Sequence, residues 1–256
     1  MLPVEAALDL SGKAAIVTGG TRGLGRSIAA ALADAGCGVV VCGRNRPDSL
    51  PEGVHFEAAD VREPEQAAAL VQATVARFGR LDILVNNAGG SPQADAASAS
   101  SRFFDAIVKL NLHAAMYMAQ AAYAPMKAAG GGSVINISSV SGIRPSPGTA
   151  AYGAAKAGLL NLTQSLAQEW GPDGIRVNAI IAGLMQTEAA EGTYGNADAQ
   201  ALVANSLPLR RMGTGEDIAN AVLWLCSDLS SWVSGARINV DGGGERPLFL
   251  DFVGVK

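Results

Sequence analysis

Short apolar runs alternate along the chain with longer segments in which apolar residues recur at helical spacing. The apolar runs predict seven strands, at residues 14–18, 38–42, 54–58, 83–86, 133–138, 176–181 and 236–240. The helical segments begin near Gly25, Pro64, Ser101, Tyr152 and Glu216. Strands that are apolar on both faces and separated by helices are typical of a parallel sheet that is covered on two sides. The pattern therefore predicts an α/β fold with a doubly wound, seven-stranded parallel sheet and helices on both faces.

The chain shows no internal boundary. No break in composition, linker or repeat divides it, so residues 1–256 are expected to form a single domain. The least regular region, at about 184–215, has Gly, Thr, Asn and Asp around short apolar pieces, and we expect a lid there. The apolar tail at about 245–256 is expected to cover the pocket or to pack on a neighbouring subunit.

Composition narrows the class of protein. Apolar residues make up 49% of the chain and charged residues 16%, so a large core is expected and extended disorder is not. The net charge of -4 and the lack of basic runs argue against nucleic acid, and a small neutral substrate fits better. The sequence contains no uninterrupted apolar stretch of about 18 residues, so no membrane-spanning helix is predicted. The three cysteines lack metal-type spacing and the chain has only two histidines, so we expect no metal site and a reducing, cytoplasmic location.

A glycine-rich turn follows the first predicted strand, and a helix begins directly after it. Glycines allow a tight turn and let backbone N–H groups approach a phosphate, and the helix start adds partial positive charge. A dinucleotide pyrophosphate fits that place, although the glycine spacing differs from Gly-x-Gly-x-x-Gly and a turn without ligand is the alternative. The candidate cofactor-binding residues are Gly19, Thr21, Arg22, Gly23, Leu24 and Gly25.

The residues after the second predicted strand bear on the type of cofactor. NAD-binding folds place an acidic residue there for the adenine ribose, whereas NADP needs a cation for the 2'-phosphate. Here the chain reads Cys42-Gly-Arg44-Asn-Arg46, with no acid before Asp48. Arg44, helped by Arg22, is suited to hold a phosphate, although solvated arginines in surface turns are the alternative. The pattern favours NADP(H), with NAD(H) as the alternative.

Tyr152 and Lys156 are four residues apart, which places both side chains on one face of a helix. A free tyrosine has a pKa of about 10, and a neighbouring ammonium stabilises the phenolate and lowers that pKa. Tyr152 is therefore a candidate general acid or base. A half-buried tyrosine beside a solvated lysine is the alternative for this pair alone.

The motifs of the chain, taken in order, resemble those of the short-chain dehydrogenase/reductase family over about residues 11–244. They are Thr18-Gly-x-x-x-Gly-x-Gly25, Asp60-Val61, Asn86-Asn-Ala-Gly89, Asn111, Asn136-Ile-Ser-Ser139, Tyr152-x-x-x-Lys156, Arg176-Val-Asn178 and Asp241-Gly-Gly243. The resemblance, which extends to members like the 3-oxoacyl-ACP reductases, implies a Rossmann-like fold. It also implies an enzyme that acts on CH–OH groups and interconverts a secondary alcohol and a ketone by hydride transfer, with NADP or NAD. The glycine spacing of this chain is the family's own form of the loop.

The resemblance also implies roles for single residues. Ser139 lies thirteen residues before Tyr152, as in the family, and would hydrogen-bond the substrate oxygen, while Tyr152 would transfer the proton. Lys156 would lower the pKa of Tyr152 and hold the nicotinamide ribose, and Asn111 would fix a water in a proton relay. The further cofactor-binding residues would be Asp60 and Val61 at the adenine, Asn87, Ala88 and Gly89 at the adenosine ribose, and Gly183, Met185 and Thr187 at the nicotinamide.

One departure from the family pattern concerns Ala182, which stands where proline is usual. Alanine lacks the φ restraint of proline, so we expect a less preorganised backbone at residues 183–185.

The residues that would line the pocket give no specific substrate. Apolar residues of the lid, Tyr194 among them, and Ile143, Arg144 and Pro145 would surround a small carbonyl or alcohol, possibly a 3-oxoacyl thioester. Arg144 would contact an anionic tail or be solvated. The family commonly forms tetramers, so a homo-oligomer, a tetramer or a dimer, is expected. The alternatives are an NAD-dependent alcohol dehydrogenase of the same family and a non-catalytic nucleotide-binding regulatory protein.

Overall fold

The computed structural model describes residues 7–247 and 249–253, and seven strands of these ranges form one parallel sheet. Their order across the sheet is β3-β2-β1-β4-β5-β6-β7. The strands are β1 (Ala14–Thr18), β2 (Gly38–Gly43), β3 (Val54–Ala58), β4 (Ile83–Asn86), β5 (Gly132–Ser139), β6 (Ile175–Ala182) and β7 (Arg237–Val240). Each predicted strand is found with its ends within one residue, and the predicted doubly wound α/β fold is confirmed.

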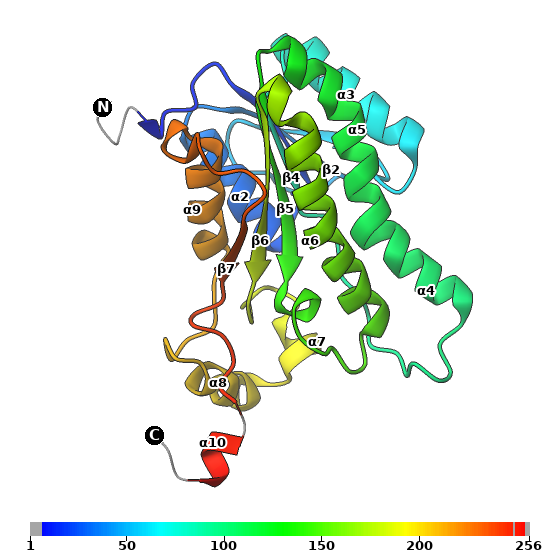
Figure 1. Cartoon of the computed structure of the whole chain (residues 1–256), viewed down its shortest axis with the longest axis vertical. Coiled ribbons are helices and arrows are strands. Elements are labelled where there is room, and N and C mark those ends of the chain that lie inside the picture. Colours follow the sequence, from blue (N-terminus) through cyan, green and yellow to red (C-terminus); the bar gives the residue numbers. More distant parts are fainter. Residues whose placement is uncertain (1–6, 248, 254–256) are drawn as a thin grey trace.

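Helices cover both faces of the sheet (Figure 1). On one face α2 (Gly23–Asp34) packs beside α9 (Gly215–Cys226). On the other face lie α3 (Pro64–Phe78), α5 (Ala114–Ala128) and α6 (Ala150–Trp170), with α4 (Ser101–Val108) before α5. The predicted helix starts agree within two residues. Not predicted were a π-helix at Lys109–His113 and two short helices in the irregular region, α7 (Ala190–Tyr194) and α8 (Ala197–Ser206).

The alternation of side chains along each strand divides the core into two layers. All five residues of β1 are buried. Val17 packs in the layer beneath α2 and α9, whereas Ile16 packs in the layer beneath α3 and α5. A strand that contributes to both layers has no polar face, which is why these strands are continuous apolar runs.

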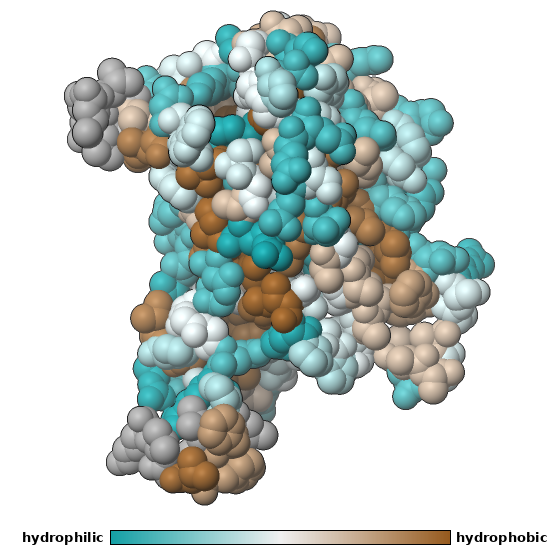
Figure 2. All heavy atoms as spheres, viewed as in Figure 1, coloured by the Kyte–Doolittle hydropathy of each residue, from teal (hydrophilic) through white to brown (hydrophobic). Residues whose placement is uncertain are grey.

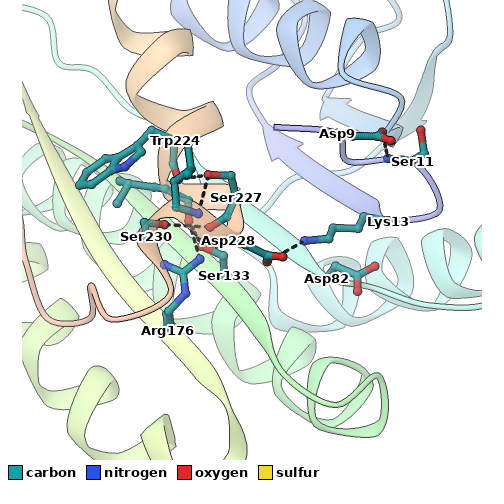
Figure 3. Close-up of polar contacts among 12 residues, drawn as sticks. Asp9, Ser11, Lys13, Asp82, Ser133, Arg176, Trp224, Ser227, Asp228 and Ser230 are labelled. Atoms are coloured by element: carbon teal, nitrogen blue, oxygen red, sulfur yellow. Dashed lines mark hydrogen bonds and ion pairs between the residues drawn. The ribbon is translucent and has the colours of Figure 1, made fainter. Parts of the chain in front are cut away.

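Polar contacts at the amino ends of the strands fasten the end of α9 to the sheet (Figure 3). Arg176, at the start of β6, donates to the carbonyl of Leu225 at 2.7 Å, and the hydroxyl of Ser133 donates to the same oxygen at 2.9 Å. Lys13 pairs with Asp228 at 3.9 Å just beyond α9. These contacts lie opposite the glycine turn, so they stabilise the fold and leave the carboxyl ends of the strands for a ligand.

The carboxyl ends of the strands provide the place for a site. The chain order reverses between β1 and β4, and ligands of such sheets bind beyond the carboxyl ends of the strands at that point. Helices α7 and α8 lie beyond the carboxyl ends of β5 and β6 (Figure 1). Within the described residues, no helix is both long enough and apolar enough to cross a membrane.

The end of the chain includes a short helix, α10 (Phe249–Phe252). Its two phenylalanines are 62% and 80% exposed, and hydrophobic residues gather at the lower end of the space-filling view, where α10 lies (Figure 2). These two aromatic rings therefore do not cover the pocket, which was one of the two expectations for residues 245–256. Residues 248 and 254–256 lie outside the described part, and packing on a neighbouring subunit stays a prediction.

Candidate active site

The turn after β1 brings backbone N–H groups to the start of α2. Gly19 and Gly23 have positive φ angles of 63° and 53°, which glycine adopts without strain. A Cβ on Gly25 would lie 2.4 Å from the carbonyl oxygen of Gly19, so only glycine fits there. Arg22, the N-cap of α2, makes no side-chain capping hydrogen bond. The first N–H groups of the helix can therefore bind an anion, as a pyrophosphate requires.

The segment after β4 supports this turn. The side-chain amide of Asn87 donates to the carbonyls of Thr18 and Gly19, at 2.9 and 3.2 Å. The hydroxyl of Thr18 accepts hydrogen bonds from the backbone N–H groups of Asn87, at 3.0 Å, and Ala88, at 2.9 Å. Asn87 thus holds the glycine turn in place, and the backbone of Ala88 is fixed beside it.

A groove of about 230 Å³ runs between the glycine turn and the segment after β6. Gly23, Ser27 and Gly215 line one side, and residues 186–188 line the other. Thr187 therefore faces the glycine turn, and its contact with the cofactor stays a prediction. Met185 is buried, and its sulfur lies only 2.6 Å from where a Cβ of Gly213 would be, so its side chain does not line this groove.

On the adenine side the structure brings two turns together. A Cβ on Gly43 would lie 3.5 Å from the methyl carbon of Thr21, so the turn after β1 touches the turn after β2. Arg22 and Arg44, which adjoin these two residues, are both exposed. Neither forms an ion pair with another residue of the described ranges. Both arginines thus adjoin the contact between the two turns, and both are accessible to a phosphate.

Asp60 does not present the free carboxylate that the family resemblance implied. The Nε of Arg62, two residues on, donates to Oδ1 of Asp60 at 2.8 Å, because the turn brings the guanidinium back over the carboxylate. The hydrogen bonds from Arg62 hold the pKa of Asp60 below its ordinary value. Val61 is buried in the core layer beneath α3. An adenine amino group would have to share Asp60 with Arg62.

Ser139, Tyr152 and Lys156 meet at the carboxyl end of β5. Ser139 ends the strand, and its hydroxyl accepts a hydrogen bond from the backbone N–H of Ser141 at 3.2 Å. Tyr152 lies in the first turn of α6, close enough to Ser139 for the serine hydroxyl to act on its pKa. The Nζ of Lys156 lies 5.6 Å from the centroid of the Tyr152 ring. Three residues that are separated by thirteen and four positions in the sequence thus lie together in the structure.

The pKa values of this group differ in part from expectation. Burial lowers the pKa of Lys156 to about 8. Burial also raises the pKa of Tyr152, and the nearby Ser139 hydroxyl acts in the opposite direction. The expected lowering by Lys156 is not found, and the Lys156 ammonium donates to the carbonyl of Ile137 at 2.8 Å. The phenol is therefore neutral at pH 7.

Asn111 belongs to the same site, although only the family resemblance singled it out. It is buried in the π-helix Lys109–His113, and such helices are frequent at functional sites. Its amide donates to the carbonyl of Gly90 and accepts from the N–H of Gly90, both at 2.9 Å. A Cβ on Gly89 would lie 2.7 Å from Oδ1 of Asn111 and 3.1 Å from Nζ of Lys156. Gly89 is thus the close contact that lets Asn111 and Lys156 approach each other.

The backbone after Ala182 is hydrogen-bonded to two other segments. Ala182 is the last residue of β6, which pairs with strands on both sides. Gly183 N–H donates to the carbonyl of Val240 at 3.0 Å. Gln186 N–H donates to the carbonyl of Gly213 at 2.7 Å. The strand β7 and the segment at Gly213 thus supply two restraints in place of the proline, and the mobility of this backbone stays a prediction.

Two contacts near the site have no local sequence signal. The hydroxyl of Tyr194, on α7, accepts a hydrogen bond from the backbone N–H of Met185 at 3.3 Å. Arg144 donates to the carboxylate of Glu245 at 2.7 Å, across 101 residues of sequence. Within the described residues, no three His, Cys, Asp or Glu side chains converge to hold a metal.

Comparison with known proteins places this site in a family. The family model for enoyl-(acyl carrier protein) reductase matches residues 19–245. A 3-oxoacyl-[acyl-carrier-protein] reductase of Chlamydia muridarum is 37% identical, over 91% of this chain and 98% of its own. A 2-dehydro-3-deoxy-D-gluconate 5-dehydrogenase of Escherichia coli is 36% identical, over 94% and 98%. A crystal structure from Sinorhizobium meliloti 1021, described as a short-chain alcohol dehydrogenase, superimposes with a TM-score of 0.85 at 38% identity and covers 93% of this chain and 98% of its own. The chain therefore belongs to the short-chain dehydrogenase/reductase family, whose members are oxidoreductases that act on CH–OH groups with NAD(P)(H).

Proposed function

We propose that the protein is an NADP(H)-dependent oxidoreductase that interconverts a secondary alcohol and a ketone, with Tyr152 as general acid and base. The observation that carries this proposal is the meeting of Ser139, Tyr152 and the buried Lys156 at the carboxyl end of β5. The nicotinamide, when bound, supplies or accepts the hydride. Family membership favours this enzyme over the non-catalytic alternative.

Three side chains would handle the substrate oxygen and its proton. Ser139 would donate a hydrogen bond to the oxygen, and Tyr152 would deliver the proton during reduction. The raised pKa of Tyr152 keeps the phenol protonated at neutral pH, as a general acid requires. Lys156 uses one of its three N–H groups on Ile137, so the others can bind the ribose hydroxyls and stabilise the developing phenolate.

Asn111 would serve as a positioning residue for the proton supply. Its amide and the Lys156 ammonium both approach the backbone at Gly89. A water held between them would connect Lys156 with solvent, so that the proton lost by Tyr152 is replaced.

The preference for NADP(H) over NAD(H) follows from the cations at the adenine side. Arg22 and Arg44 flank the contact between the two turns, and guanidinium groups bind phosphate in a bidentate manner. NAD(H) is the alternative, and initial rates with NADPH and NADH distinguish the two.

The substrate, the lid and the assembly form part of the same proposal. The name of the Chlamydia relative supports a 3-oxoacyl thioester among small carbonyl substrates. Residues 184–215 would act as a lid on a single domain, and the free thiols of all three cysteines fit the cytoplasm. The exposure of Trp232, at 99%, and of Phe252 supports a homo-oligomer, a tetramer or a dimer. A monomer in light scattering at micromolar concentration would contradict the last point.

The Tyr152→Phe variant tests the chemistry. A panel of ketones, including an acetoacetyl thioester, is first assayed with NADPH and NADH. The variant should lose turnover of every accepted ketone while NADPH still binds, as followed by nicotinamide fluorescence. Substantial turnover by the variant would show that Tyr152 is not the proton donor.

A further inference from the structure

An ion pair joins two segments at the rim of the active site. The Nη2 of Arg144 donates to Oε1 of Glu245 at 2.7 Å, and the Nε of Arg144 contacts Oε2. Two nitrogens of one edge of the guanidinium thus meet both oxygens of one carboxylate. This fork is the geometry in which arginine recognises carboxylates.

Arg144 is held close to the residues that carry the chemistry. It follows Ser139 by five residues, and its backbone N–H donates to the carbonyl of Val140 at 3.1 Å. Tyr194 of α7 lies beside the pair: burial raises the pKa of its phenol, Glu245 adds to this rise and Arg144 opposes it. Tyr194 is also within electrostatic reach of Tyr152. The guanidinium therefore lies at the rim of the site that contains the catalytic phenol.

Glu245, by contrast, stands on the segment after β7 and not on a helix or strand. It follows three consecutive glycines with positive φ angles, Gly242, Gly243 and Gly244, which permit backbone conformations that other residues avoid. The side chains of Arg144 and Glu245 are each 37% exposed. A pair this exposed is screened by water and salt, so an external carboxylate can compete with Glu245 for the guanidinium.

We propose that Arg144 is the contact for a carboxylate group of the substrate and that Glu245 occupies this position when no such substrate is bound. The substrate class is a keto acid or hydroxy acid with its carboxylate a few bonds from the reacting carbon. This inference rests on the proposed function, and it names the substrate class of the same site. Glu245 occupies only the contact for an anion, so it competes with acids for Arg144 and does not affect the binding of neutral substrates.

Matched acids and esters test the proposal by binding and by turnover. Levulinate, 5-oxohexanoate and their methyl esters are titrated by calorimetry into the full-length protein with NADP⁺, with which a ketone cannot react. The variants are Arg144→Gln, Glu245→Gln and, as a control of equal charge change, Arg77→Gln in the last turn of α3. Turnover of the same compounds with NADPH is measured in parallel.

The expected pattern separates the acids from the esters. Arg144→Gln should weaken binding of at least one acid by about ten-fold, as loss of a charge-assisted contact predicts. Glu245→Gln should strengthen binding of that acid, and neither variant should change ester binding. Arg77→Gln should behave as the wild type.

Several results would overturn the proposal. One is that the wild type binds an acid and its ester equally well, or binds no acid at millimolar concentration. Another is that both variants lose affinity for acid and ester in parallel, which would show that the ion pair has a structural role only. Failure of the proposed function would look different, because the acid-specific binding pattern would persist without turnover of any acid or ester. Turnover of esters without a preference for acids would defeat this inference alone.

Discussion

The Lys156 ammonium is bound to the backbone carbonyl of Ile137 at 2.8 Å, in the strand that ends in Ser139. The contact fixes a buried cation two residues from the hydroxyl that would hold the substrate oxygen. Removal from water disfavours the charged form of Lys156, and one carbonyl replaces its hydration only in part. The folded protein thus holds an incompletely solvated ammonium at the place where the proposed chemistry needs a positive charge.

The lowered pKa of Lys156 predicts a pH dependence of stability. The pKa falls from 10.5 to about 8 on folding, so between these pH values the unfolded chain binds more protons than the folded protein. The free energy of unfolding therefore gains from this group as pH rises through that window, by up to ~1.4 kcal/mol per pH unit. Below pH 8 both states are protonated, and the contribution is constant.

The Lys156→Met variant isolates this contribution. Urea unfolding of both proteins between pH 7 and pH 9.5 should show a stability advantage of the variant that shrinks above pH 8. Titration of the other groups cancels in the difference. A difference that does not vary with pH would show that Lys156 keeps an ordinary pKa.

The glycine turn predicts a sharp contrast between two Gly→Ala substitutions. A Cβ on Gly25 would lie 2.4 Å from both the Gly19 carbonyl oxygen and the Asn87 amide nitrogen, so Gly25→Ala should destabilise the protein by ~1–3 kcal/mol. Gly171 has a φ of -52° and open space where its Cβ would be. Gly171→Ala should be neutral or stabilising by up to ~1 kcal/mol. Chemical denaturation measures both, and equal effects would contradict the packing of the turn.

The fold was predictable because its strands are buried on both faces. A run such as residues 38–42, four of them fully apolar, has few alternatives to a central strand. The short helices α7 and α8 were not predictable, since α8 has no buried residue and its apolar spacing is weak. Its start depends on Asn196, whose side chain accepts from the N–H of Ala199 at 3.1 Å.

The site was predictable where its residues are close in sequence. Tyr152 and Lys156 share one helix, and the family pattern related them to Ser139. The contact between Arg144 and Glu245 was not predictable, because it depends on where β5 and β7 end in space. The binding of Asp60 by Arg62 was missed for another reason: neighbouring opposite charges are common, and only the turn geometry shows that they pair.

The preference for NADP(H) predicts different effects at two neighbouring arginines. Arg44→Ala should weaken NADPH binding by about ten-fold and leave NADH binding unchanged, since only NADPH carries the 2'-phosphate. Arg46 lies 5.9 Å from the Phe56 ring centroid and serves as the control, so Arg46→Ala should affect both cofactors little. Fluorescence titration at low salt measures the affinities, because screening weakens exposed contacts. An equal loss for NADPH and NADH would refute the assignment of Arg44.

The hydroxyl of Tyr194 predicts how the proposed lid is tied to the segment after β6. It accepts the N–H of Met185, whose neighbours Leu184 and Gln186 are bonded to Gly213, so Tyr194 restrains α7. In Tyr194→Phe this N–H loses its acceptor, and a neutral hydrogen bond contributes ~1 kcal/mol. Amide hydrogen exchange at Met185 should therefore become about five-fold faster, while global stability changes by less than about 1 kcal/mol. Tyr117→Phe on α5 is the matched control and should leave exchange at Met185 unchanged. If exchange at Met185 is the same in all three proteins, the hydroxyl does not hold the lid, and the restraint comes from Gly213 alone.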